Sequence, residues 1–492
     1  MSKSSLKINF LLNIAYQLLK IALPLLTVPY LSRVLLSDGI GQYSFTYSIS
    51  DYFVLAGMLG LNQYGNRAIA RVRDSKDERS RVFCSIYCMQ FIWALVVVLV
   101  YVIWALCGSG SYRTLAMAWI LSVSADLFDI SWFFFGMEEF KLTVTRNIIL
   151  KLLSLVLIFL FVRGPNDVAI YCGITSLNFF LTAIALWPFL FKRISFYKPS
   201  LEEVLVHIKP NLLLFAPVVA ISLYTQMDKI LLGVLSTSQQ VGFYDYSEKL
   251  SKIPLALITA LGTVMLPRMS GVIATGNTSG ASRYLNMSFN LAIVMAMGFA
   301  FGISSISDVF VPIFFGAGWD ECILLMALLS GIIPVVATSN VLGVQYLIPS
   351  GKDKQYTISV FIGAIVNIAL NVALVPVMDA LGSVIAVLFA ELSVLLCQAL
   401  MVKKAIQIHE WILPSICSAG SGLIMYIAVK SISCLLPEIS FSVLIIKVIV
   451  GVLVYLVLSC CWMRYFGSPI LDSVSTSINR LARRFHNKLS RS

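Results

Sequence analysis

Four ionisable side chains share one stripe of a predicted helix over residues 241–266. Their spacing of i, i+3, i+4 and i+7 makes them neighbours on a helix surface. The four residues are Asp245, Glu248, Lys249 and Lys252. Asp228 and Lys229 lie at a similar depth on the preceding apolar segment. Such cations could attract an anionic ligand while the carboxylates bind a coupling ion, or the charges could pair with one another and fix the hairpin.

Other charged residues also interrupt apolar segments. Each costs roughly 2.5–3.5 kcal/mol at the middle of a bilayer, so we expect it to be paired or to face a wet cavity. The candidates for ligand binding are Lys20 and Arg33, and those for ion coupling or pairing are Asp51, Asp126, Asp129 and Glu391.

Most of these positions also have a structural interpretation. Arg33 could extend its side chain to the membrane interface, and we expect Lys447, near the end of an apolar segment, to do so. The Asp126 and Asp129 carboxylates could bind a cation or pair with a buried lysine such as Lys151. Glu391 is a lone acid for which a structural role competes with ion coupling.

Patterns typical of enzymes are absent from the sequence. Gly351-Lys352 is followed by Asp353 and no glycine stands five residues earlier, so no phosphate-binding P-loop occurs. The sequence also lacks G-x-S-x-G, H-E-x-x-H and dinucleotide-binding motifs. The ten cysteines include no C-x-x-C pair. We therefore expect no enzymatic activity, no cofactor and no metal site.

The composition is that of a membrane protein. The chain is 59% hydrophobic and 12% charged, with a mean hydropathy of +0.89, whereas soluble domains carry about 25% charged residues. Apolar runs of roughly 20 residues recur along the chain, and each can cross a bilayer as a helix. The sequence predicts an all-α membrane protein with fourteen transmembrane helices. They are expected at 8–35, 40–64, 82–106, 114–136, 147–163, 168–190, 211–235, 241–266, 284–310, 321–348, 356–377, 381–402, 412–433 and 441–464.

The basic residues predict the orientation. They concentrate in alternate loops, such as residues 67–81, and in the C-terminal tail. By the positive-inside rule these parts are cytoplasmic, which places both termini in the cytoplasm. We expect the chain to lie in an inner membrane. The same rule accounts for the net charge of +12, so no nucleic-acid partner is expected.

An internal repeat predicts the domain organisation. Ile40-Gly41-Gln42-Tyr43-Ser44-Phe45-Thr46 matches Val241-Gly242-Phe243-Tyr244-Asp245-Tyr246-Ser247, and a weaker pair joins 136–139 to 351–354. Six spans separate the copies, so the two halves have the same orientation, as in transporters built from parallel repeats. The predicted parts are a six-helix lobe (1–190), a cytoplasmic linker (191–210), a second six-helix lobe (211–404), two extra helices (405–465) and a basic tail (466–492). Within the linker, 201–208 reads as an amphipathic surface helix or as a solvated loop.

Three segments carry a resemblance to a known family: GLNQYGNRAIA (60–70), MDKILLGVLSTSQQVGFYDYSEKL (227–250) and QYLIPSGKDKQY (345–356). With the repeat, they resemble the Wzx-type O-antigen or capsule repeat-unit flippases of the oligosaccharidyl-lipid/polysaccharide exporter superfamily. Multidrug MATE exporters and lipid II flippases share that superfamily's fold.

The resemblance implies a function. The expected substrate is an undecaprenyl-diphosphate-linked oligosaccharide, moved from the cytoplasmic to the periplasmic leaflet by alternating access. Its diphosphate needs cations, for which Lys249, Lys252, Lys20 and Lys229 are candidates. A glycan polymerase and a chain-length regulator are the protein partners that this function implies. The alternatives are a multidrug or cation exporter of the same fold and a membrane glycan polymerase.

Overall fold

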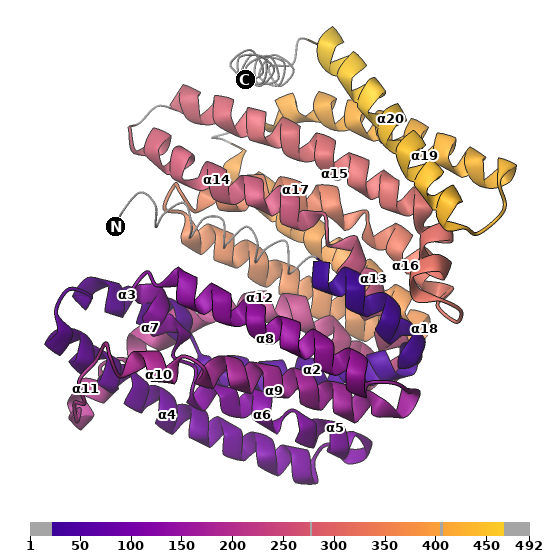
Figure 1. Cartoon of the computed structure of the whole chain (residues 1–492). Helices are drawn as coiled ribbons and strands as arrows, with labels where there is room; N and C mark the ends of the chain where they lie inside the picture. Colours follow the sequence, from indigo (N-terminus) through magenta and orange to yellow (C-terminus); the bar gives the residue numbers. More distant parts are fainter. Residues whose placement is uncertain (1–21, 276–277, 404–406, 467–492) are drawn as a thin grey trace, which may run out of the picture. The chain divides into compact units, whose positions relative to one another are not determined.

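The computed structural model describes residues 22–275, 278–403 and 407–466, which form helices joined by turns and loops and contain no strand (Figure 1). In this described part, nine helices are long and apolar enough to cross a membrane. The prediction of an all-helical membrane protein is therefore confirmed. The count of fourteen spans and the boundaries of the lobes stay predictions.

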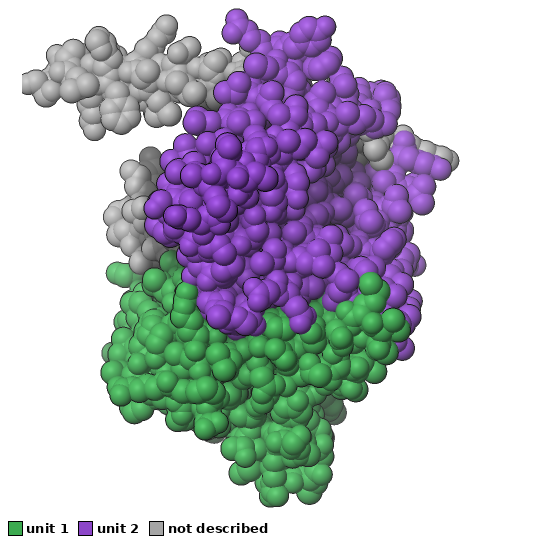
Figure 2. All heavy atoms as spheres, turned by 90° about the vertical axis from the view of Figure 1, so that its right-hand side faces the viewer, with its two compact units in different colours: residues 1–245, 375–380 green, residues 246–374, 381–492 purple. Residues whose placement is uncertain are grey.

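The chain divides into two compact units (Figure 2). Unit 1 contains residues 1–245 and 375–380, and unit 2 contains 246–374 and 381–492. The helices of unit 1 are 22–34, α2 (Leu36–Met58), α3 (Leu61–Val72), α4 (Lys76–Cys107), α5 (Arg113–Ala118), α6 (Ile120–Ser124), α7 (Ser131–Gly136), α8 (Phe140–Phe161), α9 (Val168–Ile184), α10 (Trp187–Leu190), α11 (Leu201–Leu205) and α12 (Ile208–Leu235). Helix α13 (Ser238–Ser251) is shared, and unit 2 continues with α14 (Leu255–Ala274), α15 (Thr278–Phe315), α16 (Glu321–Leu329), α17 (Ile332–Leu342), α18 (Asp353–Val402), α19 (Ile412–Leu435) and α20 (Phe441–Tyr465). Helix α18 has non-helical backbone at Asp379, and its residues 375–380 belong to unit 1.

Helix α4 shows how local sequence sets these elements. Ser75 caps its first turn by accepting a hydrogen bond from the Glu78 N–H (3.4 Å), and acidic side chains there favour the helix dipole. The helix then runs through an apolar sequence to Gly108. Only 33% of its most apolar window is buried inside the protein. The rest of that surface is suited to lipid, because only hydrocarbon tolerates so long an apolar face.

An aromatic core fixes α3 against α7 in unit 1. Trp132 and Phe133 are fully buried, and the Phe83 ring lies 5.4 Å from that of Trp132. Gly65 lets α3 approach Trp132 of α7 closely, since a methyl group at Gly65 would lie 2.5 Å from the Trp132 ring. In unit 2 the corresponding anchor is Trp411, whose ring stacks on Phe289 at 4.1 Å.

Five predicted spans are broken in the described structure. The predicted helix 40–64 becomes α2 and α3, and 168–190 becomes α9 and α10. The predicted helix 114–136 becomes α5, α6, a 3-10 turn (Ala125–Leu127, η2) and α7, and 321–348 becomes α16, α17 and a π turn (Gly343–Leu347, η4). The predicted helix 241–266 stops at Ser251 and resumes at Leu255 as α14. Pro254 explains the last break, since it lacks an N–H and disfavours helical backbone before it.

The two segments of the weaker sequence repeat form similar turns, but in a shifted register. Glu138 (φ 57°) and Gly351 (φ 70°) both adopt left-handed backbone. In each turn the next residue donates its N–H to a carbonyl five residues earlier, at 3.0 and 2.9 Å. Glu138 is therefore the counterpart of Gly351, whereas the sequence match paired Gly351 with Gly136. The side chain of Glu138 makes its turn the more strained of the two.

The linker between the predicted lobes contains a short helix. Helix α11 begins with a capping box in which Ser200 and Glu203 each bind the other's backbone N–H. Val204 is buried, while Leu201 is 71% exposed. The segment is thus helical only to Leu205, where a turn leads into α12. Its location on the membrane surface stays a prediction.

Candidate transport site

Lys229 on α12 and Asp245 on α13 form a buried ion pair. Lys229 Nζ lies 2.9 Å from Asp245 Oδ1, and the two side chains are 10% and 1% exposed. Ser44 on α2 donates a hydrogen bond to the other carboxylate oxygen at 2.7 Å. Asp245 thus binds Ser44, which belongs to the other copy of the sequence repeat. The positive charge of Lys229 is balanced by Asp245 in this conformation.

Asp228 is buried next to the Lys229–Asp245 pair in the sequence, and together with Ser44 and Tyr244 these residues form a buried polar layer. The Tyr244 hydroxyl donates to Asp228 Oδ2 at 2.8 Å, and both residues are buried. Adjacent residues of α12, Asp228 and Lys229, therefore engage adjacent residues of α13. These two polar contacts tie the helices of the hairpin together at one depth.

Two glycines bring α2 and α13 together at this site. A methyl group on Gly41 would lie 1.5 Å from the Ser238 carbonyl oxygen, and one on Gly242 would lie 2.1 Å from that of Ser37. The two contacts are reciprocal, as contacts across a local two-fold are. Backbones this close require glycine. The repeated sequence motif therefore creates the crossing that places Ser44 beside its repeat counterpart, Asp245.

The remainder of the predicted stripe lies in unit 2. Glu248 is 5% exposed and forms an ion pair with Lys252 at 2.6 Å. Lys252 lies one residue past the end of α13, so the helical stripe holds three of the four predicted residues. Lys249 is exposed and its Nζ lies 5.5 Å from the centre of the Tyr246 ring, which stacks on Trp319.

The break in the predicted fourth span is held by side chains from neighbouring helices. Gln90 on α4 donates to the carbonyl oxygens of Asp126 (2.7 Å) and Asp129 (2.9 Å). Tyr87 binds the carbonyl of Leu127 at 3.1 Å, and Trp187 binds that of Phe128 at 2.9 Å. Each backbone carbonyl from Asp126 to Asp129, where the helix is interrupted, therefore accepts a hydrogen bond from a side chain. In a membrane interior such carbonyls need a partner within the protein.

The acids around this break differ in their surroundings. Asp126 is 4% exposed, whereas Asp129 and Asp51 are half-buried. Asp129 Oδ1 accepts the Ser131 N–H at 2.9 Å, which caps the start of α7. Asp51 lies on α2, where Lys229 acts on it electrostatically. The structure therefore joins the N-terminal acids to the Lys229 site through α2.

Comparison with known proteins identifies the family. A sequence model of the family described as "Polysaccharide biosynthesis protein" matches residues 6–272. This chain belongs to that family. It is 24% identical over 396 residues to the "Putative O-antigen transporter" of Escherichia coli (strain K12), an alignment that covers 79% of this chain and 95% of that protein. The resemblance expected from the sequence is therefore confirmed.

Solved structures give the fold of this polysaccharide biosynthesis protein. An inward closed conformation of the lipid II flippase MurJ matches with a TM-score of 0.76 at 15% identity, covering 93% of this chain and 99% of that one. An inward-facing multidrug resistance MATE transporter matches with a TM-score of 0.57 at 14% identity, covering 77% of this chain and 98% of that one. At such identities these matches establish the fold alone.

Of the remaining predicted residues of this family member, Arg33 and Glu391 are described. Arg33 is exposed and donates from Nη1 to the Pro29 carbonyl oxygen of its own helix at 2.7 Å. Glu391 on α18 is 6% exposed and acts electrostatically on Tyr356 in unit 2. Lys20 lies outside the described residues.

The expectation for Lys447 was wrong. Its side chain is fully buried, and Nζ lies 3.2 Å from Asp308 Oδ1, so it does not extend to an interface. Lys430 lies 3.0 Å from the other carboxylate oxygen of Asp308. This cluster joins α15, α19 and α20. Asp308 was missed although it falls inside the predicted span 284–310, where the rule for charges in membrane helices would have found it.

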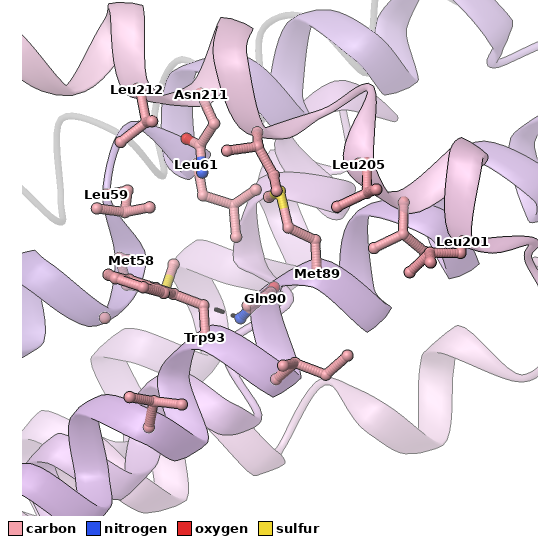
Figure 3. A pocket seen from close by; sticks show the side chains of 15 residues that line it. Met58, Leu59, Leu61, Met89, Gln90, Trp93, Leu201, Leu205, Asn211 and Leu212 are labelled. Atoms are coloured by element: carbon pink, nitrogen blue, oxygen red, sulfur yellow. Dashed lines mark hydrogen bonds between the residues drawn. The ribbon is translucent and has the colours of Figure 1, made fainter.

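Unit 1 also holds an apolar cavity of about 340 Å³. It lies between the end of α2, α4, α11 and the start of α12, with Trp93, Leu201 and Leu212 in its wall (Figure 3). Gln90 and Asn211 are its polar lining residues. A cavity of this composition can accept an apolar chain and offers nothing that would bind a charged group.

Proposed function

We propose that the protein is a flippase that moves undecaprenyl-diphosphate-linked oligosaccharide repeat units from the cytoplasmic to the periplasmic leaflet by alternating access. The observation that carries the proposal is the buried Lys229–Asp245 pair, in a membrane protein of the polysaccharide biosynthesis family. Buried charges in a membrane are costly and mark substrate or ion pathways. The names of the O-antigen transporter and of MurJ support a lipid-linked glycan as the substrate.

The proposed binding of the diphosphate relies on cations that are already balanced. Lys229 and Lys252 hold carboxylates at 2.9 and 2.6 Å, so an anionic ligand would exchange with Asp245 and Glu248 as the partner of each lysine. Lys249, which is exposed over the Tyr246 ring, would make the first contact. In this scheme Lys20 and Arg33 are further candidate cations for the diphosphate. The candidates for ion coupling or pairing are Asp228, Glu248, Asp51, Asp126, Asp129 and Glu391.

The remaining parts of the proposal concern the setting of the protein. We place it in a bacterial inner membrane with both termini in the cytoplasm, built as two parallel six-helix lobes followed by two helices. A glycan polymerase and a chain-length regulator would act on the product after it reaches the periplasmic leaflet.

A deletion strain tests the function. Loss of the protein should leave lipid-linked repeat units on the cytoplasmic leaflet and remove the surface polymer, and the wild-type gene should restore both. Full-length surface polymer in the deletion strain, with no second flippase present, would refute the proposal. Altered drug resistance with normal polymer would instead favour a multidrug exporter, and polymerisation by the purified protein a glycan polymerase.

Lys249→Ala tests the binding role against a matched control. Lys352 also lies over a tyrosine ring, at 5.4 Å from the centre of Tyr346, but in the turn before α18. We expect Lys249→Ala to abolish surface polymer with the protein present at normal abundance, Lys249→Arg to retain part of it, and Lys352→Ala to retain all of it. Equal effects of Lys249→Ala and Lys352→Ala would exclude a specific role for Lys249.

A further inference from the structure

The Asp126 carboxyl group occupies an unusual position in the broken fourth span. The residue is 4% exposed, and its Oδ2 atom is buried with no hydrogen-bond partner among the described residues. A methyl group on Gly57 would lie 2.4 Å from this oxygen, so the glycine backbone of α2 covers it. Side chains hold the backbone of the break, while Oδ2 of the carboxyl group has no donor among the described residues.

The charged and titratable groups around Asp126 do not compensate a negative charge. Helix α2 contributes Asp51, the break itself contributes Asp129, and α4 contributes Tyr87 beside Gln90. Helices α6 and α9, which also pack against the break, contain no Asp, Glu, Lys, Arg or His; their titratable residues are Tyr171 and Cys172 on α9. Lys229, the cation that acts on Asp51, forms its ion pair with Asp245. A second carboxylate near a buried one favours protonation of one of them.

A metal ion does not fit this position. The four carbonyl oxygens from Asp126 to Asp129 are occupied by Gln90, Tyr87 and Trp187. The contact with Gly57 leaves no room on the open side of Oδ2 for an ion with further ligands. The described residues also contain no group of three or more His, Cys, Asp or Glu side chains arranged to hold a metal. A proton needs one oxygen and no added volume.

We propose that Asp126 is a proton-binding site, occupied in this conformation, whose release and uptake of the proton couples transport to the proton gradient. An ionised carboxylate without a donor is strongly disfavoured in such surroundings, whereas the neutral acid is tolerated. The proton leaves when a change of conformation moves α2 and Gly57 away and admits water to Oδ2. The coupling rests on the proposed flippase function, but the proton site does not.

Infrared difference spectroscopy of the purified full-length protein in lipid vesicles tests the site without a substrate. The C=O stretch of a protonated carboxylic acid should be present at neutral pH and should lose one component in Asp126→Asn. Asp129→Asn is the matched control, since the Asp129 carboxyl group belongs to the same break but has a donor, the Ser131 N–H. The site is refuted if Asp126→Asn leaves the band unchanged, or if Asp129→Asn removes the same component.

Folding gives a second, independent measurement. If Asp126 is a neutral acid, Asp126→Leu should cause little loss of abundance. If Asp126 is ionised and paired with other groups, the same substitution should lower abundance strongly. Loss of Asp126→Leu from the membrane while Asp126→Asn accumulates would therefore contradict a proton site enclosed by apolar and backbone atoms.

Transport separates the coupling from the flippase proposal. Vesicles would be loaded with repeat units extracted from the deletion strain, with and without a pH gradient. We expect wild-type flipping to rise severalfold with the gradient and Asp126→Asn flipping to be the same in both conditions. Gradient-independent flipping by wild-type protein would refute the coupling alone, whereas no flipping in either condition would refute the function and leave the infrared result to decide the site.

Discussion

Neutralising one partner of the Lys229–Asp245 pair should destabilise unit 1 strongly. The two side chains are 10% and 1% exposed and their charged atoms lie 2.9 Å apart, so solvent screens the pair little. Removing one partner of a buried pair costs about 3–5 kcal/mol because the other charge remains buried. At about 1.4 kcal/mol for each factor of ten, Lys229→Met should lower the folding equilibrium constant roughly a hundredfold to several thousandfold.

The double variant makes the reasoning falsifiable. Lys229→Met with Asp245→Asn removes both charges and keeps a hydrogen-bonding group for Ser44, so it should recover most of the lost stability. The measurement is unfolding of the detergent-solubilised protein by increasing denaturing detergent. Lys447→Met is the comparison, since Asp308 is 30% exposed and keeps Lys430 at 3.0 Å, so no charge is left unpaired and the loss should be smaller. If Lys229→Met costs no more than Lys447→Met, or the double variant is no more stable than the single ones, the buried pair is not the cause.

Three further outcomes follow from packing and hydrogen bonding. Gly242→Ala places a methyl group 2.1 Å from the Ser37 carbonyl oxygen and should cost about 1–3 kcal/mol in thermal unfolding, while Gly173→Ala, which meets no atom within 4 Å, should not destabilise. Gln90→Leu should cost about 1–3 kcal/mol for each of the two carbonyls it leaves unpaired, and equal stability to wild type would contradict the role of Gln90 in the break. Burial lowers the pKa of His207 from its ordinary value of 6.5, so the stability that this neutral histidine contributes is present above that value and is lost as the pH falls below it. Thermal unfolding on both sides of pH 6.5 should show that loss in wild type and not in His207→Asn.

The sequence predicted which residues would be buried and charged better than it predicted their partners. Lys229, Asp228 and Asp245 were found because the cost of a charge in a membrane depends on residue type alone. Their surroundings depend on tertiary structure, so Ser44 could not be named as a partner. For the same reason Lys447 was assigned to an interface, although Asp308, 139 residues earlier, pairs with it in the interior.

The break at residues 126–130 shows a second limit. This segment contains no proline or glycine and its apolar character predicts a continuous helix. What stabilises the break is a set of donors from distant parts of the chain, Gln90, Tyr87 and Trp187. Rules based on local sequence cannot predict that these distant side chains will donate hydrogen bonds to the break. The break at 252–254, by contrast, was signalled by Pro254, and the turn near Asp379 was predicted between the spans 356–377 and 381–402.

The repeat supplies the geometry of the Lys229 site, and its divergence supplies the chemistry. Gly41 and Gly242 make reciprocal contacts, so equivalent residues of the two copies face each other. Two identical side chains there would meet as two carboxylates or as two hydroxyls, whereas Ser44 and Asp245, 201 residues apart, meet as donor and acceptor. The same offset relates Lys229 to Val28, which is buried and carries no charge. Both members of the ion pair therefore belong to the second copy, while the first copy contributes a neutral hydrogen bond to the shared carboxylate. The crossing is thus reciprocal in its backbone contacts but carries a one-sided charge pair, and this asymmetry is what the proposed exchange of Asp245 for an anionic ligand requires.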